Sequence, residues 1–201
     1  MENTFTIAVY TENQIGLLHR VTTIFTRRHI NIESLTVSES EVEGIHRYTI
    51  VVNATEEQIK KLAGQLEKQI EIIRARYYLT ESTIYQEVAL YKISSQAMEN
   101  GALLEQIIRE NHARIMCVER DFLIIEKTGH QNETRKLFKL LEPFTILEFV
   151  RSGRVALNRT SQSVSDDLKA LEMNRPEVEA IGAYRQWVKT NYEPVMKQIH
   201  Q

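Results

Sequence analysis

The residues best suited to bind a ligand are two asparagines and a glycine that flank one helical segment. Asn13 and Gly16 lie in the stretch YTENQIGLLHRV at residues 10–21, and Asn31 follows in the stretch HINIESL. The N–H groups at the start of a helix have no partner within the helix, and they attract a carboxylate. Gly16 has no side chain, so a ligand can approach the backbone closely there. Asn13 can both donate and accept hydrogen bonds, which suits a ligand that carries an ammonium group beside a carboxylate.

The spacing of these residues determines whether they can share one ligand. Asn31 stands at the opposite end of the expected helix from Gly16, about 15 residues and ~20 Å away along the helix. The two residues cannot easily share a ligand within one chain, but a symmetric pair of chains could bring Asn31 of one copy to Gly16 of the other. The residues alone leave a second interpretation open, in which Asn13 caps the helix, Asn31 forms a turn after it and no ligand binds.

Residues that could carry catalysis or bind a metal ion do not gather in the sequence. The six histidines lie apart, and no two have the i, i+4 spacing of a helical metal site. Cys117 lies in the apolar stretch IMCV and is interpreted as a packed side chain rather than a nucleophile. The sequence also has no Gly-rich phosphate loop. We therefore expect a chain that is not an enzyme by itself and that holds no metal.

Composition narrows the class of protein further. The chain has 201 residues, of which 42% are hydrophobic, enough for one large core or two small ones. The net charge of −2 provides no general attraction for nucleic acid or an anionic membrane. The single cysteine excludes a disulfide within the chain. With no basic-then-apolar leader and no apolar run near the ~20 residues of a membrane span, we expect a soluble, cytoplasmic protein.

Periodicity in the first half predicts a βαββαβ unit. Apolar residues alternate over 4–10, as in a half-buried strand, and an apolar stripe follows Gly16, as in an amphipathic helix. Thr55 and Gln58 have the spacing of a capping box, which predicts the start of a second helix. The remaining strands are expected at 32–39, 45–53 and 70–78.

The same order returns after the polar stretch at residues 80–86. Strands are expected at 87–93, 114–119, 122–128 and 145–150, with helices near 101–112 and 131–142. The first of these helices is expected to bury Leu103, Leu104, Ile107 and Ile108. Residues 159–172 are interpreted as a linker, and Pro176 as the start of a last amphipathic helix. That helix is expected to dock either on its own domain or on a partner.

Three stretches together resemble the small, regulatory subunits of acetolactate synthase, also called acetohydroxyacid synthase. They are N-x-x-G-L-L-x-R-V at 13–21, N-I-E-S-L-T-V at 31–37 and V-R-S-G-R-V-A-L-N-R at 150–159. The resemblance implies an α+β fold of two tandem ferredoxin-like βαββαβ domains followed by a C-terminal helical extension. The implied domains are an ACT domain at 1–80, which binds an amino-acid effector and dimerises, an ACT-like domain at 86–158, and a linker with a C-terminal helix at 159–201.

The resemblance also implies a partner and a function. Subunits of this family bind and activate the large catalytic subunit and make it sensitive to feedback by branched-chain amino acids, usually valine. Thiamine diphosphate, Mg and FAD are expected only in that partner. The implied effector site lies between the ACT domains of two chains and is carried onto Asn13, Gly16, Leu17, Leu18, Asn31 and Ile32. Arg20 and Arg27 are candidates for contact with the catalytic subunit. The alternatives are a free-standing ACT sensor that regulates another partner and an adaptor that has lost its ligand.

Overall fold

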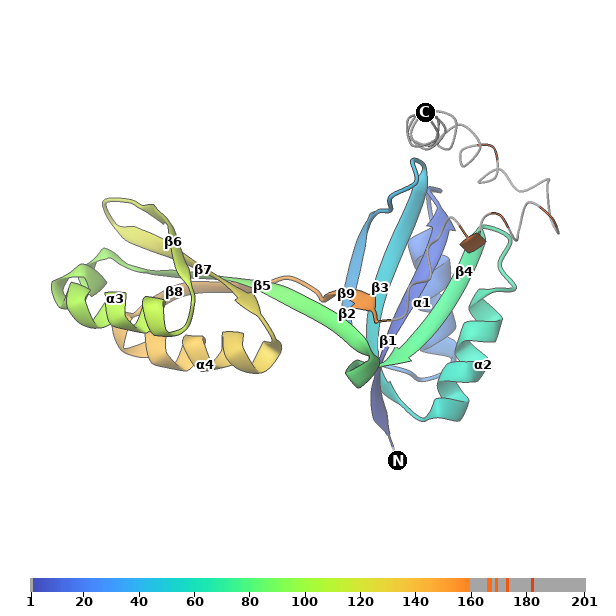
Figure 1. Ribbon diagram of the computed structural model, residues 1–201, viewed down its shortest axis with the longest axis horizontal. Helices are drawn as coiled ribbons and strands as arrows, with labels where there is room; N and C mark the ends of the chain where they lie inside the picture. Colours follow the sequence, from blue (N-terminus) through green and yellow to red (C-terminus); the bar gives the residue numbers. More distant parts are fainter. Residues whose placement is uncertain (1, 160–165, 168, 170–172, 174–181, 183–201) are drawn as a thin grey trace, which may run out of the picture. The chain divides into compact units, whose positions relative to one another are not determined.

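The computed structural model describes residues 2–159 together with residues 166, 167, 169, 173 and 182 (Figure 1). The chain divides into two compact units. The first contains the residues up to Ile84 and includes the chain again from Ala156, and the second runs from Tyr85 to Val155. The domain limits expected from the sequence, at residues 80, 86 and 158, stay predictions beside this division.

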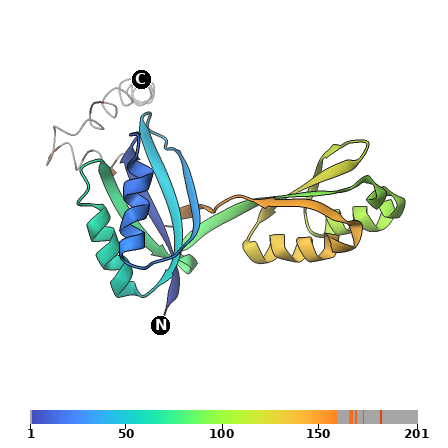
Figure 2. The ribbon, with the colours of Figure 1, turned by 180° about the vertical axis from the view of Figure 1, so that it is seen from behind.

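The first unit has the βαββαβ order expected from the sequence. Its elements are β1 (Asn3–Glu12), α1 (Leu17–Arg27), β2 (Ile32–Glu39), β3 (Ile45–Ala54), α2 (Glu56–Leu66) and β4 (Ile72–Leu79). The four strands form a sheet in the order β2-β3-β1-β4, and every neighbouring pair is antiparallel. Both helices cover the same face of this sheet (Figure 2).

Apolar side chains on one face of the strands form the core of the first unit. Phe5, Ile7 and Val9 of β1 point toward the helices and are at most 2% exposed. They pack with Phe25 of α1 and Leu62 of α2 in one continuous apolar cluster. Full burial of each such side chain contributes about 1.5–3 kcal/mol to folding. This cluster therefore holds both helices against the sheet.

The two helices of this unit begin in different ways. Helix α2 has the expected capping box: Thr55 Oγ1 accepts a hydrogen bond from the Gln58 N–H at 3.3 Å, and the Thr55 N–H donates to Gln58 Oε1 at 2.9 Å. Helix α1 instead starts at Gly16, which has a φ of +82° and provides no capping side chain. The start of α1 thus lacks the side-chain cap that closes the start of α2.

The second unit repeats the arrangement with additions. Short 3-10 helices occur at Thr80–Ser82 (η1), Ser95–Asn100 (η2) and Glu142–Phe144 (η3). The main elements are β5 (Thr83–Ser94), α3 (Gly101–Glu110), β6 (Arg114–Val118), β7 (Phe122–Gly129), α4 (Gln131–Leu141) and β8 (Ile146–Arg151). The short strand β9 (Val155–Asn158) and η1 fall mainly in the first unit of this division. The sheet has the order β6-β7-β5-β8, and β9 also pairs with β5. Two antiparallel sheets with βαββαβ units confirm the predicted fold class.

The core of the second unit contains a buried tyrosine with a specific hydrogen bond. Tyr91 is fully buried, and its hydroxyl donates to the carbonyl oxygen of Thr134 at 2.6 Å. Burial raises the pKa of this phenol. Helix α4 starts nearby with the His130 N–H donating to Glu133 Oε2 at 2.6 Å. A Cβ at Gly129 would lie only 2.5 Å from that oxygen, so a glycine at this position leaves room for the Glu133 cap.

Three expectations differ from the structure. Leu103 was expected inside, but it is 54% exposed because the inward stripe of α3 consists of Leu104 and Ile108. The polar stretch at 80–86 is not a simple break, since β5 begins within it at Thr83, which is buried. The strand β9 was not foreseen, because its four residues form no alternating pattern of useful length.

The predicted linker and last helix fall largely outside the described residues. Residues 166, 167, 169, 173 and 182 are described, and all five are helical. Of the helices in the described part of the chain, none has the length and apolar character that a membrane crossing requires.

Candidate functional site

The candidate site is the turn that leads from β1 into α1. The Asn13 N–H donates to the carbonyl oxygen of Gly44 at 3.0 Å, and the Leu17 N–H donates to that of Gln14 at 3.3 Å. Between them Gly16 adopts a φ of +82°, a conformation that L side chains rarely adopt. A Cβ at position 16 would meet nothing within 4 Å. The backbone conformation therefore favours glycine here, and the space beside it is open.

The first turn of α1 provides an uncompensated positive end. The Leu17 N–H donates to the Gln14 carbonyl, but the N–H groups of Leu18 and His19 have no carbonyl within the helix to bind. No acidic side chain lies in this turn, although carboxylates are favoured at such positions. Gly16, Leu18 and His19 are all exposed. An external carboxylate can thus reach amides that no side chain of the turn caps.

Arg20, the arginine in the first turn of α1, forms an ion pair with Glu71. Arg20 Nη1 lies 2.5 Å from Glu71 Oε1. A hydrogen bond to its own backbone N–H, followed by the bond from Arg20, holds the pKa of Glu71 below its ordinary value. Arg20 is thereby held at Glu71, the residue before β4. Sequence reasoning missed this pair because its members lie 51 positions apart.

The alternative roles for the two asparagines are wrong. Asn13 does not cap α1, because the capping position is Gly16 and it has no side-chain hydrogen bond. Asn31 does not form the turn after α1, since that turn is made by Arg28 and by His29, whose φ is +54°. The Asn31 side chain is exposed and donates to Glu33 Oε1 at 2.9 Å. Neither amide is therefore required to end the helix.

The apolar residues assigned to the site differ in accessibility. Leu18 is 43% exposed and Ile32 is half-buried against the core, so both present surface beside the helix ends. Leu17 is fully buried, so it packs inside the protein and does not present surface to a ligand. Ile15 is fully exposed in the same turn. The lining role of these side chains stays a prediction.

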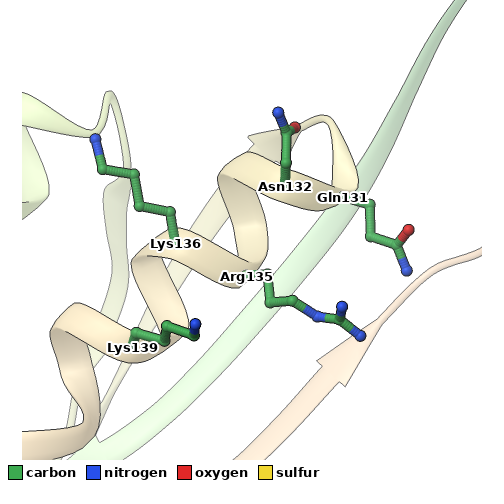
Figure 3. Close-up of a pocket in the computed structure, with 5 residues that line it drawn as sticks. All are labelled: Gln131, Asn132, Arg135, Lys136 and Lys139. Atoms are coloured by element: carbon green, nitrogen blue, oxygen red, sulfur yellow. The ribbon is translucent and has the colours of Figure 1, made fainter.

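The structure brings together Asn13 and Gly16 but not Asn31. The 11 residues of α1 separate them, which corresponds to about 16 Å of helix. Two hollows elsewhere are lined mainly by polar and basic side chains. One, of about 400 Å³, lies on α4 beside Gln131, Asn132, Arg135, Lys136 and Lys139 (Figure 3). Another, of about 620 Å³, is lined by Arg28, by residues of α2 and by Lys68 and Gln69 after it. Neither hollow contains Gly16 or Asn31.

Groups that could bind a metal ion do not converge in the described residues. Within residues 2–159 and the five described positions beyond them, no three histidine, cysteine or acidic side chains are placed to hold one. Cys117, expected to be packed, is half-buried.

Comparisons with known proteins assign the family. Residues 7–74 match a family model described as the AHAS small subunit-like ACT domain, and residues 86–160 match one described as the small subunit of acetolactate synthase. The acetolactate synthase small subunit of Bacillus subtilis is 35% identical over 162 residues, which cover 80% of this chain and 94% of that protein. A probable acetolactate synthase small subunit of Archaeoglobus fulgidus is 38% identical over 154 residues, covering 77% and 96%.

A solved structure agrees with the sequence relatives. The crystal structure of the acetolactate synthase small subunit from Thermotoga maritima is similar to this one with a TM-score of 0.72 and 29% sequence identity. The similarity covers 80% of this chain and 99% of that one. Fold, family models and relatives of nearly full length thus agree, and the chain belongs to the acetolactate synthase small subunit family.

Proposed function

We propose that this chain binds the catalytic large subunit of acetolactate synthase, raises its activity and makes it sensitive to feedback by a branched-chain amino acid, with valine as the first candidate. The small-subunit names of its relatives support a regulatory role beside a catalytic partner. Thiamine diphosphate chemistry belongs to that partner in this proposal, and the present chain contributes the effector site.

The start of α1 is the observation that carries the proposal. At Gly16 no side chain caps the first-turn amides of Leu18 and His19, no acidic side chain compensates them, and the space beside Gly16 is open. A free amino acid has a carboxylate for these amides and an ammonium group for an amide oxygen. Its branched side chain rests against the exposed surface of Leu18 and against Ile32.

The second half of the site comes from a second chain in this proposal. Gly16 and Asn31 lie at opposite ends of α1, so one ligand meets both only where two copies pair through their ACT domains. The chain is therefore expected to be a homodimer with two equivalent sites. An effector bound between two chains favours one arrangement of the dimer over another, and this preference alone shifts activity. A coupling of about 1–3 kcal/mol accounts for inhibition of several-fold to ~100-fold.

Reconstitution tests the proposal. The purified chain is mixed with a large catalytic subunit, and acetolactate formation is measured without effector and with valine, leucine or isoleucine. We expect activation by the chain alone and inhibition when one of the three is added. A chain that binds valine but leaves the catalytic subunit unaffected would be a free-standing sensor, and the proposal would fail.

A further inference from the structure

The first sheet has a face that lies opposite α1 and α2, here called the distal face. At its centre Ala8 of β1 lies between Thr49 of β3 and Arg76 of β4 in the strand register. Helices α1 and α2 cover the other face (Figure 2), yet Ala8 is only 2% exposed and Thr49 only 5%. The centre of the distal face is therefore covered, although Asn53 and Arg74 on the same face are exposed.

Two described parts of the chain lie on the distal face. The guanidinium of Arg47 donates a hydrogen bond to the carbonyl oxygen of Ala156, which is itself buried. Arg76 Nη2 donates to Asp167 Oδ1 at 2.5 Å, and Arg74 Nε lies 3.8 Å from the same oxygen. The short segment at 166–167 appears in brown beside β4 in Figure 1. A carboxylate from far along the chain thus meets two arginines of one strand.

The contact between Asp167 and Arg76 is buried on both sides. The side chains of Asp167 and Arg76 are 10% and 14% exposed. Within the described residues, Asp167 Oδ2 is buried without a hydrogen-bond partner. Burial raises the pKa of this carboxyl, and Arg76 and then Arg74 offset the effect in part. A surface ion pair is worth little, but an enclosed pair of this kind is sensitive to the loss of either partner.

The position of Asp167 in the chain gives the contact its significance. The match to the family model ends at residue 160, and the chain continues to residue 201. Asp167 therefore belongs to an extension that follows the matched part. We propose that Arg76 and Arg74 form a carboxylate-binding site on the distal face, and that its occupant is Asp167 of the same chain, which tethers the extension to the ACT sheet.

This inference is independent of the effector proposal, because the distal face and the turn at Gly16 use different residues. In this proposal Asp167 of the same chain occupies the site at Arg76 and Arg74, so a partner subunit does not bind there. Arg76 is the principal ligand, since it makes the hydrogen bond and is the more enclosed of the two arginines. Arg74 also lies 3.4 Å from Glu67, so its charge is shared.

The test uses the full chain and the protease Lys-C, which cleaves after lysine. Lys169 is exposed and lies two residues beyond Asp167. Asp167→Arg places a third guanidinium against Arg76 and Arg74, and it adds no site for this protease. We expect cleavage after Lys169, followed by mass spectrometry, to be several-fold faster than in the parent chain, because proteolysis tracks the released population. Asp167→Ala, which adds no charge, should change the rate in the same direction.

Two further measurements separate the tether from general effects of charge. Glu99→Arg makes the same change of charge at an exposed residue of η2 in the second unit and should leave cleavage close to the parent rate. Hydrogen exchange over residues 165–173 gives a readout that does not depend on protease preference, and it should show the same order of variants. Equal rates for the two arginine variants by both methods would overturn the proposal.

A charge swap completes the test. Arg76→Asp alone should release the extension, and Arg76→Asp combined with Asp167→Arg should restore protection, since opposite charges again face each other. Circular dichroism checks that the sheet stays folded in each variant. If Arg76→Asp unfolds the sheet, Arg76→Gln replaces it and should release the extension to a smaller degree. A folded double variant that remains as exposed as Asp167→Arg alone would contradict the assigned pair.

Discussion

Gly16 and Asn31 stand at the two ends of α1 and are both exposed: Gly16 is the N-cap residue and offers no capping side chain, and Asn31 lies beyond the C-terminal turn. The helix holds them too far apart for one amino acid to bridge them within a chain. The same rigid separation fixes where a second copy must bring its own Asn31. The effector proposal therefore requires a dimer in which Asn31 of one chain lies near Gly16 of the other, in addition to an open turn at Gly16.

Gly16→Asp is expected to abolish inhibition by valine while activation of the catalytic subunit is retained. The new carboxylate would repel that of the effector and occupy the open space beside the turn. Gly16→Asn is the matched control, because both residues tolerate a positive φ comparably and differ in charge. The measurement is acetolactate formation in the reconstituted enzyme over a range of valine concentrations. If the aspartate variant remained as sensitive as the parent, the site assignment would be wrong.

Mixed dimers test whether the site is shared between chains. Gly16→Asp and Asn31→Ala are each expected to impair valine binding when present in both chains. In a dimer with one chain of each kind, one site combines the intact Gly16 of one chain with the intact Asn31 of the other. Calorimetry should then detect about one tight site per dimer. A site contained within one chain predicts no tight site in the mixed dimer, so the two arrangements give different results.

Tyr91→Phe is expected to destabilise the second unit by about 1–2 kcal/mol, because the buried carbonyl of Thr134 loses its donor. The change removes one oxygen and leaves the ring packing intact. Tyr85→Phe removes a hydroxyl from the same strand at a half-buried position and should cost less. Hydrogen exchange of β5 amides in urea measures the difference. Equal effects of the two substitutions would contradict the role given to the Tyr91 hydroxyl.

Glu126 makes the stability of the second unit depend on pH. A hydrogen bond from the Thr128 hydroxyl at 2.6 Å, followed by one from Arg114, holds the pKa of Glu126 below its ordinary value of 4.5. A carboxyl with a lowered folded-state pKa stabilises the fold above its ordinary pKa, and this contribution is lost as the pH falls through the folded-state pKa. Because Arg114 is largely exposed, we expect Glu126→Gln to cost only about 1–2 kcal/mol at pH 7.

The measurement for Glu126 is the urea midpoint of the second unit at several pH values. The difference between the parent chain and Glu126→Gln should be largest near neutrality and should shrink in acid. Glu148→Gln, at an exposed position on β8, is the control and should show little change at any pH. A difference that grew as the pH fell would reverse the assigned sign.

The sequence predicts the fold well where the signals are local. The spacing of Thr55 and Gln58 is enough to place the start of α2, and alternation through Phe5, Ile7 and Val9 is enough to place β1 and its buried face. Leu103 was assigned wrongly because its apolar character fits the helical stripe, and only the packing of α3 shows that Leu104 takes the inward position.

The sequence also predicts only the part of the site that depends on local signals. The turn at Gly16 is visible in the sequence because a glycine between a strand and a helix is a local pattern. The pairs Arg20–Glu71 and Arg76–Asp167 join residues 51 and 91 positions apart. Nothing in the spacing of such residues indicates that they meet, since the meeting depends on which strands become neighbours.

The caps of α2 and α4 have a consequence for the order in which the chain folds. Each is closed by a hydrogen bond between residues three positions apart, Thr55 with Gln58 and His130 with Glu133. Contacts this near in sequence form early, before distant strands have found each other. We therefore expect α2 and α4 to begin forming locally in their own halves of a newly synthesised chain, and we expect the first turn of the helix at Gly16, which has no such cap, to depend more on its neighbouring strands.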